Sequence, residues 1–437
     1  MSKLIVDFNQ ICGKIKPMNA VGQPPVWGWS NHEFFHYLQD ANIPYSRLHD
    51  VEGSFGASVF VDIPNLFRNF ESDVNDPKSY DFTFTDLLIE GLMEYHCLPV
   101  FRLGVTIENY YKIKAYRIYP PTDFKKWAEI CEHVISHYTE GWANGFHYNI
   151  QYWEIWNEPD NKEMWLGTME EFFELYTVAA THLKNIFKDR IKIGGYGSSG
   201  FYYALAHQKN VEQKSDLSVP EWYDSDRTKY MIDFMHGFFR YIKDHHAPID
   251  FFSWHSYGGV TDTESMVDYL NGVLIDYGFE NLETHLNEWN NANKLEMRNT
   301  SYASSNAAAM MIAMQKKKVD MLCYYDARIA ASRFAGLFNP STHTPCCTYY
   351  SFQAFGELLK LGNMVPCELD GAYALAAKSN EKYAVLIANP TDYPLKIESD
   401  LNGARLFLID ASHYLTEMNL SPTSFEIPSY GTILITG

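Results

Sequence analysis

The sequence predicts an α/β protein: a (β/α)8 TIM barrel followed by a small C-terminal antiparallel β-sandwich. From about residue 20 to about residue 362, short β-branched or aromatic runs alternate eight times with segments of 3.6-residue periodicity. Strands that alternate with helices pair in parallel, and eight such units are the count of a closed barrel. A doubly wound open sheet would show the same alternation, but no Gly-rich fingerprint follows the first predicted strand.

The predicted strands are short runs rich in β-branched and aromatic residues. They are Val26–Trp29, Tyr45–His49, Pro99–Gly104, Gln151–Trp156, Ile191–Gly195, Phe251–His255, Glu283–Asn287 and Met321–Tyr325. The predicted helices carry apolar residues every three to four positions. They are Glu33–Ala41, Phe84–His96, Asp123–Thr139, Met169–Lys188, Tyr230–Asp244, Thr263–Tyr277, Ser304–Lys317 and Tyr349–Lys360.

After residue 362 the helical period disappears, and Asn-Pro, Asp-Tyr-Pro, Asn-Gly and Ser-Tyr-Gly turns separate short strands. These strands are Tyr373–Ala377, Tyr383–Ile387, Leu395–Ile397, Leu406–Ile409, Phe425–Ile427 and Thr432–Ile435. We therefore expect a barrel domain over residues 20–362 and an accessory sandwich over residues 363–437. Residues 1–19, with the strand-like segment Lys3–Asp7, are assigned to the sandwich.

Composition excludes several classes of protein. The chain has 437 residues, of which 46% are apolar, so it can bury a large core and is neither disordered nor collagen-like. Its net charge of −19 argues against binding nucleic acid or an anionic membrane. No apolar run approaches the roughly 18 residues of a membrane span. The aromatic content of 16% suits a ligand with hydroxylated edges and C–H faces.

The cysteines and the N-terminus bear on compartment. Seven cysteines without C-x-x-C spacing are interpreted as buried thiols rather than a zinc site or a disulfide framework. The first residues lack a basic segment followed by an apolar one, which favours the cytoplasm; removal of a signal peptide would instead imply a periplasmic or secreted protein. The sequence leaves a homo-oligomer open.

Two glutamates stand at the ends of predicted strands four and seven. Glu158 lies in a Trp-Asn-Glu-Pro motif and Glu288 in an Asn-Glu-Trp-Asn motif. These strands face each other across a barrel, so both carboxylates are expected to meet one ligand at its C-terminal mouth. Opposed carboxylates suit glycosidic cleavage, in which one protonates the leaving oxygen and the other attacks the sugar carbon. The neighbouring Trp156 and Trp289 are expected to form apolar walls.

Three long connections follow predicted strands two, five and eight, over residues 51–80, 196–228 and 326–347. In a barrel they all emerge at the C-terminal face, so they are expected to shape a pocket.

The two glutamate motifs resemble those of clan A glycoside hydrolases, whose acid/base and nucleophile sit at these strand ends. Within the clan the sequence most resembles glycoside hydrolase family 39, the β-xylosidase and α-L-iduronidase family. Residues 45–50 (Tyr-Ser-Arg-Leu-His-Asp), residues 76–82 before the second helix and residues 254–257 (Trp-His-Ser-Tyr) also carry the resemblance. It covers nearly the whole barrel, and the trailing sandwich is similar to the family's accessory domain.

The resemblance implies a role for each matching residue. Glu158 would be the acid/base, Glu288 the nucleophile of a retaining double displacement, and Asn157 the partner of the sugar 2-hydroxyl. His49 would bind the sugar in the reacting subsite, and Arg47 would lie below it, near the nucleophile carboxylate.

Four further positions complete the expected site. His255 and Tyr257 share strand parity, and the resemblance implies contacts with sugar hydroxyls and the nucleophile. The clan usually has a Trp platform at the end of strand eight, where this sequence has Tyr324 and Tyr325. One of the two, with Tyr325 as the choice, is expected to substitute, and Trp289 is expected to contact the substrate.

A rival motif spans residues 32–36, where His-Glu-Phe-Phe-His matches the H-E-x-x-H signature of zinc peptidases. On a helix, His32 and His36 would share one face. No third ligand follows at metzincin spacing, because residue 39 is Gln, and this first helix should lie outside the barrel.

The sequence thus predicts a retaining, exo-acting glycosidase that needs no metal and no cofactor. The expected substrate is an oligosaccharide or glycoside, most simply a β-xyloside or an α-L-arabinoside, while galactosides, glucosides and iduronides stay open. An iduronide would need basic side chains, for which Arg328 and Arg333 are the candidates. The alternatives are a catalytically silent carbohydrate-binding barrel and a zinc peptidase using His32 and His36.

Overall fold

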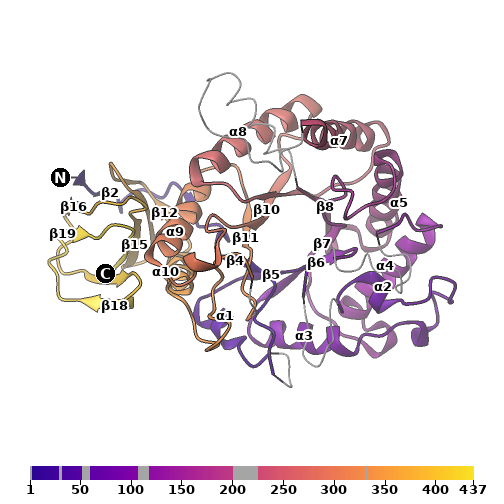
Figure 1. Ribbon diagram of the computed structural model, residues 1–437, viewed down its shortest axis with the longest axis horizontal. Coiled ribbons are helices and arrows are strands. Elements are labelled where there is room, and N and C mark those ends of the chain that lie inside the picture. Colours follow the sequence, from indigo (N-terminus) through magenta and orange to yellow (C-terminus); the bar gives the residue numbers. More distant parts are fainter. Residues whose placement is uncertain (1, 29–31, 52–59, 107–117, 200–224, 330–331) are drawn as a thin grey trace.

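The computed structural model describes residues 2–28, 32–51, 60–106, 118–199, 225–329 and 332–437. Its centre is a closed barrel with the spatial strand order β10-β11-β4-β5-β6-β7-β8-β9. All eight neighbouring pairs are parallel, and helices surround the barrel (Figure 1). The predicted barrel is confirmed. Its strands are β4 (Ala20–Gly22), β5 (Tyr45–Leu48), β6 (Leu98–Leu103), β7 (Tyr152–Ile155), β8 (Lys192–Ser198), β9 (Phe251–Ser256), β10 (Glu283–Trp289) and β11 (Met321–Tyr324).

Helices follow the strands close to the predicted positions and bury their apolar faces against the barrel. Side-chain caps define some of their starts, such as the reciprocal Thr168–Glu171 capping box that opens α5. The helices are α1 (His36–Asp40), α2 (Ile63–Leu66), α3 (Thr83–Glu94), α4 (Phe124–Thr139), α5 (Met169–Phe187), α7 (Ser225–Asp244), α8 (Val260–Tyr277), α9 (Ser301–Gln315) and α10 (Cys347–Leu361).

The first barrel strand is not where the sequence predicted it. Residues 26–28 are not in a strand, Trp29 lies outside the described residues, and the strand is β4 at Ala20–Gly22. All three β4 residues are buried, and a Cβ added to Gly22 would lie 3.6 Å from the Tyr324 carbonyl oxygen. That distance is an ordinary contact, and β4 is the strand because it pairs with β11 and β5, whereas strand propensity favours the larger residues that follow.

A β-sandwich, antiparallel except for one parallel pair at β1, lies beside the barrel, on the side of α9 and α10 (Figure 1). Its larger sheet has the order β18-β17-β20-β15-β14-β12-β3, and a three-stranded sheet β1-β16-β19 faces it across an apolar core. The strands are β1 (Ser2–Lys3), β2 (Ile5–Val6), β3 (Gly13–Lys14), β12 (Asn363–Val365), β13 (Cys367–Glu368), β14 (Tyr373–Ser379), β15 (Lys382–Ala388), β16 (Leu395–Glu398), β17 (Arg405–Ile409), β18 (Tyr414–Met418), β19 (Ser424–Ile427) and β20 (Thr432–Thr436).

The chain's first residues pair with these sheets. β1 pairs in parallel with β16, β2 pairs with β13, and β3 pairs with β12. Four strands of this region, β3, β12, β13 and β18, were missed by the sequence analysis. The division into domains near residue 362 stays a prediction.

The cysteines form no disulfide, and six of the seven are buried as predicted, whereas Cys12 is exposed. Among the described residues, no helix combines the length and apolar character needed to cross a membrane.

The barrel interior is layered. An apolar layer at its N-terminal end includes Tyr152, Phe251 and Met321. Nearer the C-terminal end the inward side chains are polar and buried, and include Arg47, Arg102, Glu154, Ser253 and Asn287. Polar side chains at this depth need partners, and the network they form supports the site.

Candidate active site

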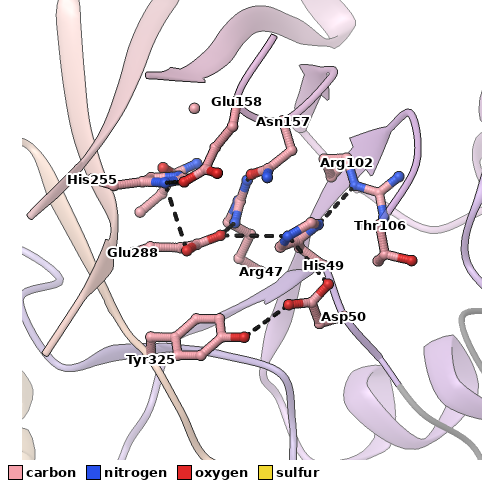
Figure 2. A network of polar contacts seen from close by, with 12 residues as sticks. Arg47, His49, Asp50, Arg102, Thr106, Asn157, Glu158, His255, Glu288 and Tyr325 are labelled. Carbon is pink, nitrogen blue, oxygen red and sulfur yellow. Dashed lines mark hydrogen bonds and ion pairs between the residues drawn. The ribbon is translucent and has the colours of Figure 1, made fainter. Parts of the chain in front are cut away.

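Two carboxylates meet at the C-terminal ends of the barrel strands. Glu288 lies in β10 and Glu158 follows β7, and both side chains approach His255 (Figure 2). One carboxylate oxygen from each glutamate and one ring nitrogen of His255 all lie within 4.8 Å of one another. The side chain of Glu158 is 20% exposed and that of Glu288 only 7%. The structure therefore brings the two predicted glutamates together in different surroundings.

A β-bulge aims Glu288 into the barrel. Leu286 pairs with Trp254 and Glu288 pairs with His255, so Asn287 is an extra residue in β10. A bulge re-aims the side chains on either side of it. Both Asn287 and Glu288 consequently reach polar partners inside the barrel.

A turn after β7 positions Glu158. Trp156 and Glu158 have φ values of 71° and 48°, in the left-handed region that residues with a Cβ seldom adopt. The Glu158 amide donates to the carbonyl oxygens of Tyr196 and Gly197, both at 3.1 Å. These bonds fold the chain back over the strand ends, so that the Glu158 carboxylate faces the barrel axis.

Arg47 connects the residues of the site through all three of its nitrogens. Nε donates to Glu154 at 2.7 Å, Nη1 to Glu288 at 2.7 Å, and Nη2 to Asn157 at 2.6 Å. Burial opposes its charge, but the two glutamates more than compensate and raise the pKa of Arg47 above its ordinary value. Arg47 is therefore a fixed positive charge beside Glu288, as the sequence predicted.

Glu288 has three further neighbours. The Tyr257 hydroxyl donates to Oε2 at 2.8 Å. His49 Nε2 lies 3.6 Å from Oε1, and His255 Nδ1 lies 3.6 Å from Oε2. The two short hydrogen bonds, from Arg47 and Tyr257, fix the orientation of the Glu288 carboxylate.

Glu158 is held mainly by His255. His255 Nδ1 lies 2.8 Å from Oε1, and the Asn161 amide donates to Oε2 at 3.4 Å. Burial favours the neutral carboxyl, but the hydrogen bond and charge of His255 outweigh it and lower the pKa of Glu158. Burial also lowers the pKa of His255, and the charge of Glu288 with the bond to Glu158 overcomes it and raises that pKa. The two groups therefore favour a charged pair.

His49 is neutral and oriented by a second arginine. Arg102 Nε donates to Nδ1 at 3.2 Å, so the ring proton belongs on Nε2, which faces Glu288 and Asp50. Burial, followed by the charges of Arg47 and Arg102, lowers the pKa of His49 well below its ordinary value. Arg102 is itself paired with Asp62.

Aromatic side chains border the site next to Glu288. Tyr257 stacks on Phe334 with a centroid distance of 4.9 Å, and Tyr325 meets Phe334 edge-on at 5.5 Å. The Tyr325 hydroxyl donates to Asp50 at 2.8 Å (Figure 2). The predicted position of Tyr325 at the site agrees with these contacts.

Two aromatic residues, Trp289 and Trp156, lie elsewhere than predicted. Trp289 is fully buried and packs against Tyr324 and Phe352 of α10, behind the barrel wall. Trp156 packs against Trp165 and Trp127 of α4. Successive strand residues point to opposite faces, so an inward Glu288 places Trp289 outward. The expectations that Trp289 contacts the substrate and that Trp156 walls the site are therefore wrong.

The sequence analysis missed Glu154, Arg102, Asp62 and Phe334. Glu154 had a usable signal, because it stands at the centre of a strand, two residues from the inward-facing Tyr152. A charged residue on the inner face of a barrel strand needs a partner and so deserves a functional hypothesis. Asp62 and Phe334 lie in connections that show no hydrophobic periodicity, and their placement depends on tertiary contacts.

The H-E-x-x-H segment does not form the predicted helical pair. α1 begins at His36, so His32 precedes the helix and the two rings do not share a helical face. Within the described ranges, the group of side chains with metal-like spacing is Glu158, His255 and Glu288. Arg47 already supplies a positive charge to Glu288, and we assign no metal ligand there.

Parts of the three long connections, residues 52–59, 200–224 and 330–331, lie outside the described residues.

Known proteins resemble this chain in sequence and in fold. The sequence is 24% identical over 226 residues to a β-xylosidase of Geobacillus stearothermophilus, covering 49% of this chain and 38% of that protein. It is 29% identical over 146 residues to a β-xylosidase of Caldicellulosiruptor saccharolyticus, covering 31% and 28%. The matches thus span well under half the length of these curated relatives.

Two solved structures share the whole fold. A glucosidase from Croceicoccus marinus superposes with a TM-score of 0.79 at 19% identity, covering 100% of this chain and 98% of that one. A monomeric β-xylosidase from Caulobacter crescentus gives a TM-score of 0.68 at 15% identity, covering 99% and 98%. At these identities the likeness concerns the fold. The sequence model of glycosyl hydrolases family 39 matches residues 29–334, most of the chain. The chain belongs to glycosyl hydrolase family 39.

Proposed function

We propose that the protein is a retaining, exo-acting glycosidase in which Glu288 is the nucleophile and Glu158 the acid/base. The observation that carries the proposal is the closeness of the two carboxylates, whose nearest oxygens lie within 4.8 Å. Retaining enzymes hold their carboxyl groups about 5–5.5 Å apart, whereas inverting enzymes need about 6.5–9.5 Å for a water molecule. The spacing supports direct attack by a carboxylate.

In the first step Glu288 attacks the anomeric carbon while the bond to the leaving oxygen breaks. That oxygen takes the proton of Glu158, so the leaving group departs as a neutral alcohol. Arg47 and Tyr257 hold the Glu288 carboxylate in place through hydrogen bonds. In the second step Glu158 takes a proton from water, whose oxygen displaces Glu288 from the sugar.

The closeness of the carboxylates also supports the change of role of Glu158. A like charge within about 4–6 Å disfavours ionisation, so a carboxylate at Glu288 works against His255, which lowers the pKa of Glu158. When Glu288 becomes an ester its charge disappears, and Glu158 ionises more easily. The same residue then suits an acid before the first step and a base before the second.

The binding groups fit a hydroxylated ring. Arg47 fixes the carbonyl oxygen of Asn157, which turns the amide nitrogen of Asn157 to donate to a sugar 2-hydroxyl. His49 presents an N–H beside Glu288 for a second hydroxyl. Tyr325 and Phe334 offer apolar surface for the C–H side of the sugar.

We propose a β-xyloside or α-L-arabinoside as the substrate, because both curated relatives are β-xylosidases. An iduronide is less suitable. Arg328 forms an ion pair with Asp326 at 2.8 Å, and Arg333 lies over the Phe334 ring at 4.9 Å. The charge of Arg328 is already balanced, which disfavours its use for a sugar carboxylate.

A panel of aryl glycosides tests the proposal. We expect the highest kcat/KM on the xyloside or arabinoside, and proton NMR should show that the first product keeps the anomeric configuration. Glu288→Ala should lose at least about 10⁴-fold in kcat. Glu158→Ala should still react with a dinitrophenyl glycoside, and azide should raise its turnover and give a glycosyl azide of retained configuration.

The remaining alternatives have clear outcomes. A silent carbohydrate-binding barrel would bind sugars but turn over none of the panel, and inversion of the first product would refute the retaining assignment. Activity that is lost with a chelator and restored by zinc would revive the peptidase or another metal-dependent reaction.

A further inference from the structure

A third carboxylate lies directly below the two candidate catalytic ones. Glu154 of β7 is fully buried, with 0% of its surface exposed. It accepts hydrogen bonds from Arg47 Nε at 2.7 Å, Ser253 Oγ at 2.5 Å and Asn287 Nδ2 at 2.6 Å. These donors come from β5, β9 and β10, so Glu154 ties together the strands that carry the site.

Glu154 and Glu288 share one positive charge. Arg47 Nε and Nη1 each lie 2.7 Å from a carboxylate oxygen, one of Glu154 and one of Glu288. Burial would favour a neutral Glu154, but the charge of Arg47, the bond from Arg47 and those from Ser253 and Asn287 lower the pKa of Glu154. Its carboxylate is therefore charged and competes with Glu288 for the same guanidinium.

We propose that Glu154 is a positioning residue that anchors Arg47 and draws part of its charge away from Glu288, which keeps the nucleophile reactive. An undivided ion pair would stabilise the charged carboxylate more in the ground state than in the transition state, where that charge is being lost, and so would slow attack. The inference rests on the proposed function where it takes Glu288 as the nucleophile.

Other charged and titratable groups face Glu288 or Glu154. A substitution of Glu154 leaves all of them in the chain. Those near Glu288 are Arg47, His49, Glu158, His255, Tyr257 and Tyr325. Arg47 is the basic side chain in contact with both Glu154 and Glu288, and Cys323 of β11 lies near both carboxylates. Removal of the Glu154 charge therefore acts on Glu288 through the shared Arg47 and also ends the direct repulsion between the two carboxylates.

Two substitutions separate charge from shape. Glu154→Gln keeps the shape and removes the charge. The buried Asn287 Oδ1 has no partner among the described residues, so a rotated Asn287 amide can accept from the new glutamine. Glu154→Asp keeps the charge and shortens the reach. Glu283→Gln is the matched control, because Glu283 pairs with Lys192 at the opposite end of β10.

The first measurement is the pH dependence of kcat/KM. We expect Glu154→Gln to move the acidic limb about one pH unit lower, because the undivided charge of Arg47 makes Glu288 easier to ionise. At the plateau, kcat/KM should fall at least about tenfold. Glu154→Asp and Glu283→Gln should leave the acidic limb in place. Thermal unfolding of each variant checks that it folds.

The second measurement does not need turnover. In protein labelled with carbon-13 at the glutamate carboxyl carbons, the Glu288 signal is assigned by its loss in Glu288→Gln. Its titration midpoint should fall in Glu154→Gln and stay unchanged in Glu283→Gln. An unchanged midpoint in Glu154→Gln, or an equal shift in Glu154→Asp, would overturn the proposal. Failure of the proposed function would instead appear as a wild-type protein that cleaves no glycoside while the midpoint still shifts.

Discussion

Gly197 lies against the residues that hold the two carboxylates, and one methyl group there should disturb all of them. Its φ is +65°, and a Cβ at this position would lie 3.1 Å from Asn157 Oδ1, 3.1 Å from His255 Nε2 and 3.3 Å from Arg47 Nη2. Each distance is shorter than the usual distance between a Cβ and a neighbouring heavy atom. Gly197→Ala therefore displaces the Asn157 amide, the His255 partner of Glu158 and the Arg47 partner of Glu288 at once.

The expected size follows from two contributions. A residue with a Cβ in the left-handed region costs about 1–2 kcal/mol, partly offset by a gain of about 0.4–1 kcal/mol from the less flexible unfolded chain. At this chain length the net loss lowers Tm by about 1 °C. The side chains must also move by a few tenths of an ångström. Since a 1 Å misplacement costs about 10²-fold, we expect kcat/KM to fall about fivefold to tenfold.

Gly403→Ala is the matched control. Gly403 has a φ of +73°, and a Cβ there would have nothing within 4 Å. Both variants should lose similar stability in thermal unfolding, but only Gly197→Ala should lose kcat/KM on an aryl glycoside. If Gly197→Ala retains wild-type kcat/KM, or if Gly403→Ala loses as much, the contacts around Gly197 do not position the site.

Three further changes test the network. Tyr257→Phe removes a hydrogen bond to the charged Glu288, worth about 1.5–3 kcal/mol, so kcat/KM should fall about tenfold to 150-fold with little change in stability. Burial, then the charge of Glu158, raises the pKa of Asp160 to about 6 from 3.8, so the stability it contributes is complete below about pH 4 and is lost as pH rises through 6. The free energy of unfolding of Asp160→Asn, measured with urea and taken relative to that of the wild type, should therefore rise by up to about 3 kcal/mol from pH 4 to pH 7. The same difference between variant and wild type at both pH values would contradict this. Thr168→Ala breaks the capping box of α5 and should cost about 1 kcal/mol in the same assay without changing kcat/KM.

The aromatic residues around the site show where sequence reasoning stopped. Composition indicated many rings, and the motifs placed Trp156 and Trp289 beside the glutamates. The structure turns both outward against helices and brings Phe334, 46 positions after Glu288, next to Tyr257 instead. Sequence proximity predicts neighbours along a strand, but the faces of that strand alternate, and loop residues reach the site only through packing.

The sequence by itself determined the barrel, the strand ends that carry Glu158 and Glu288, and the family, because periodicity and short motifs are local properties of a chain. The tertiary structure alone decided the first barrel strand, because β4 pairs with both β11 and β5 although the residues after it are stronger strand formers. It also decided how charge is distributed. Arg47 divides its contacts between Glu154 and Glu288, which are 107 and 241 positions away from it. A charge balance depends on distances in space, and closure of the barrel sets those distances.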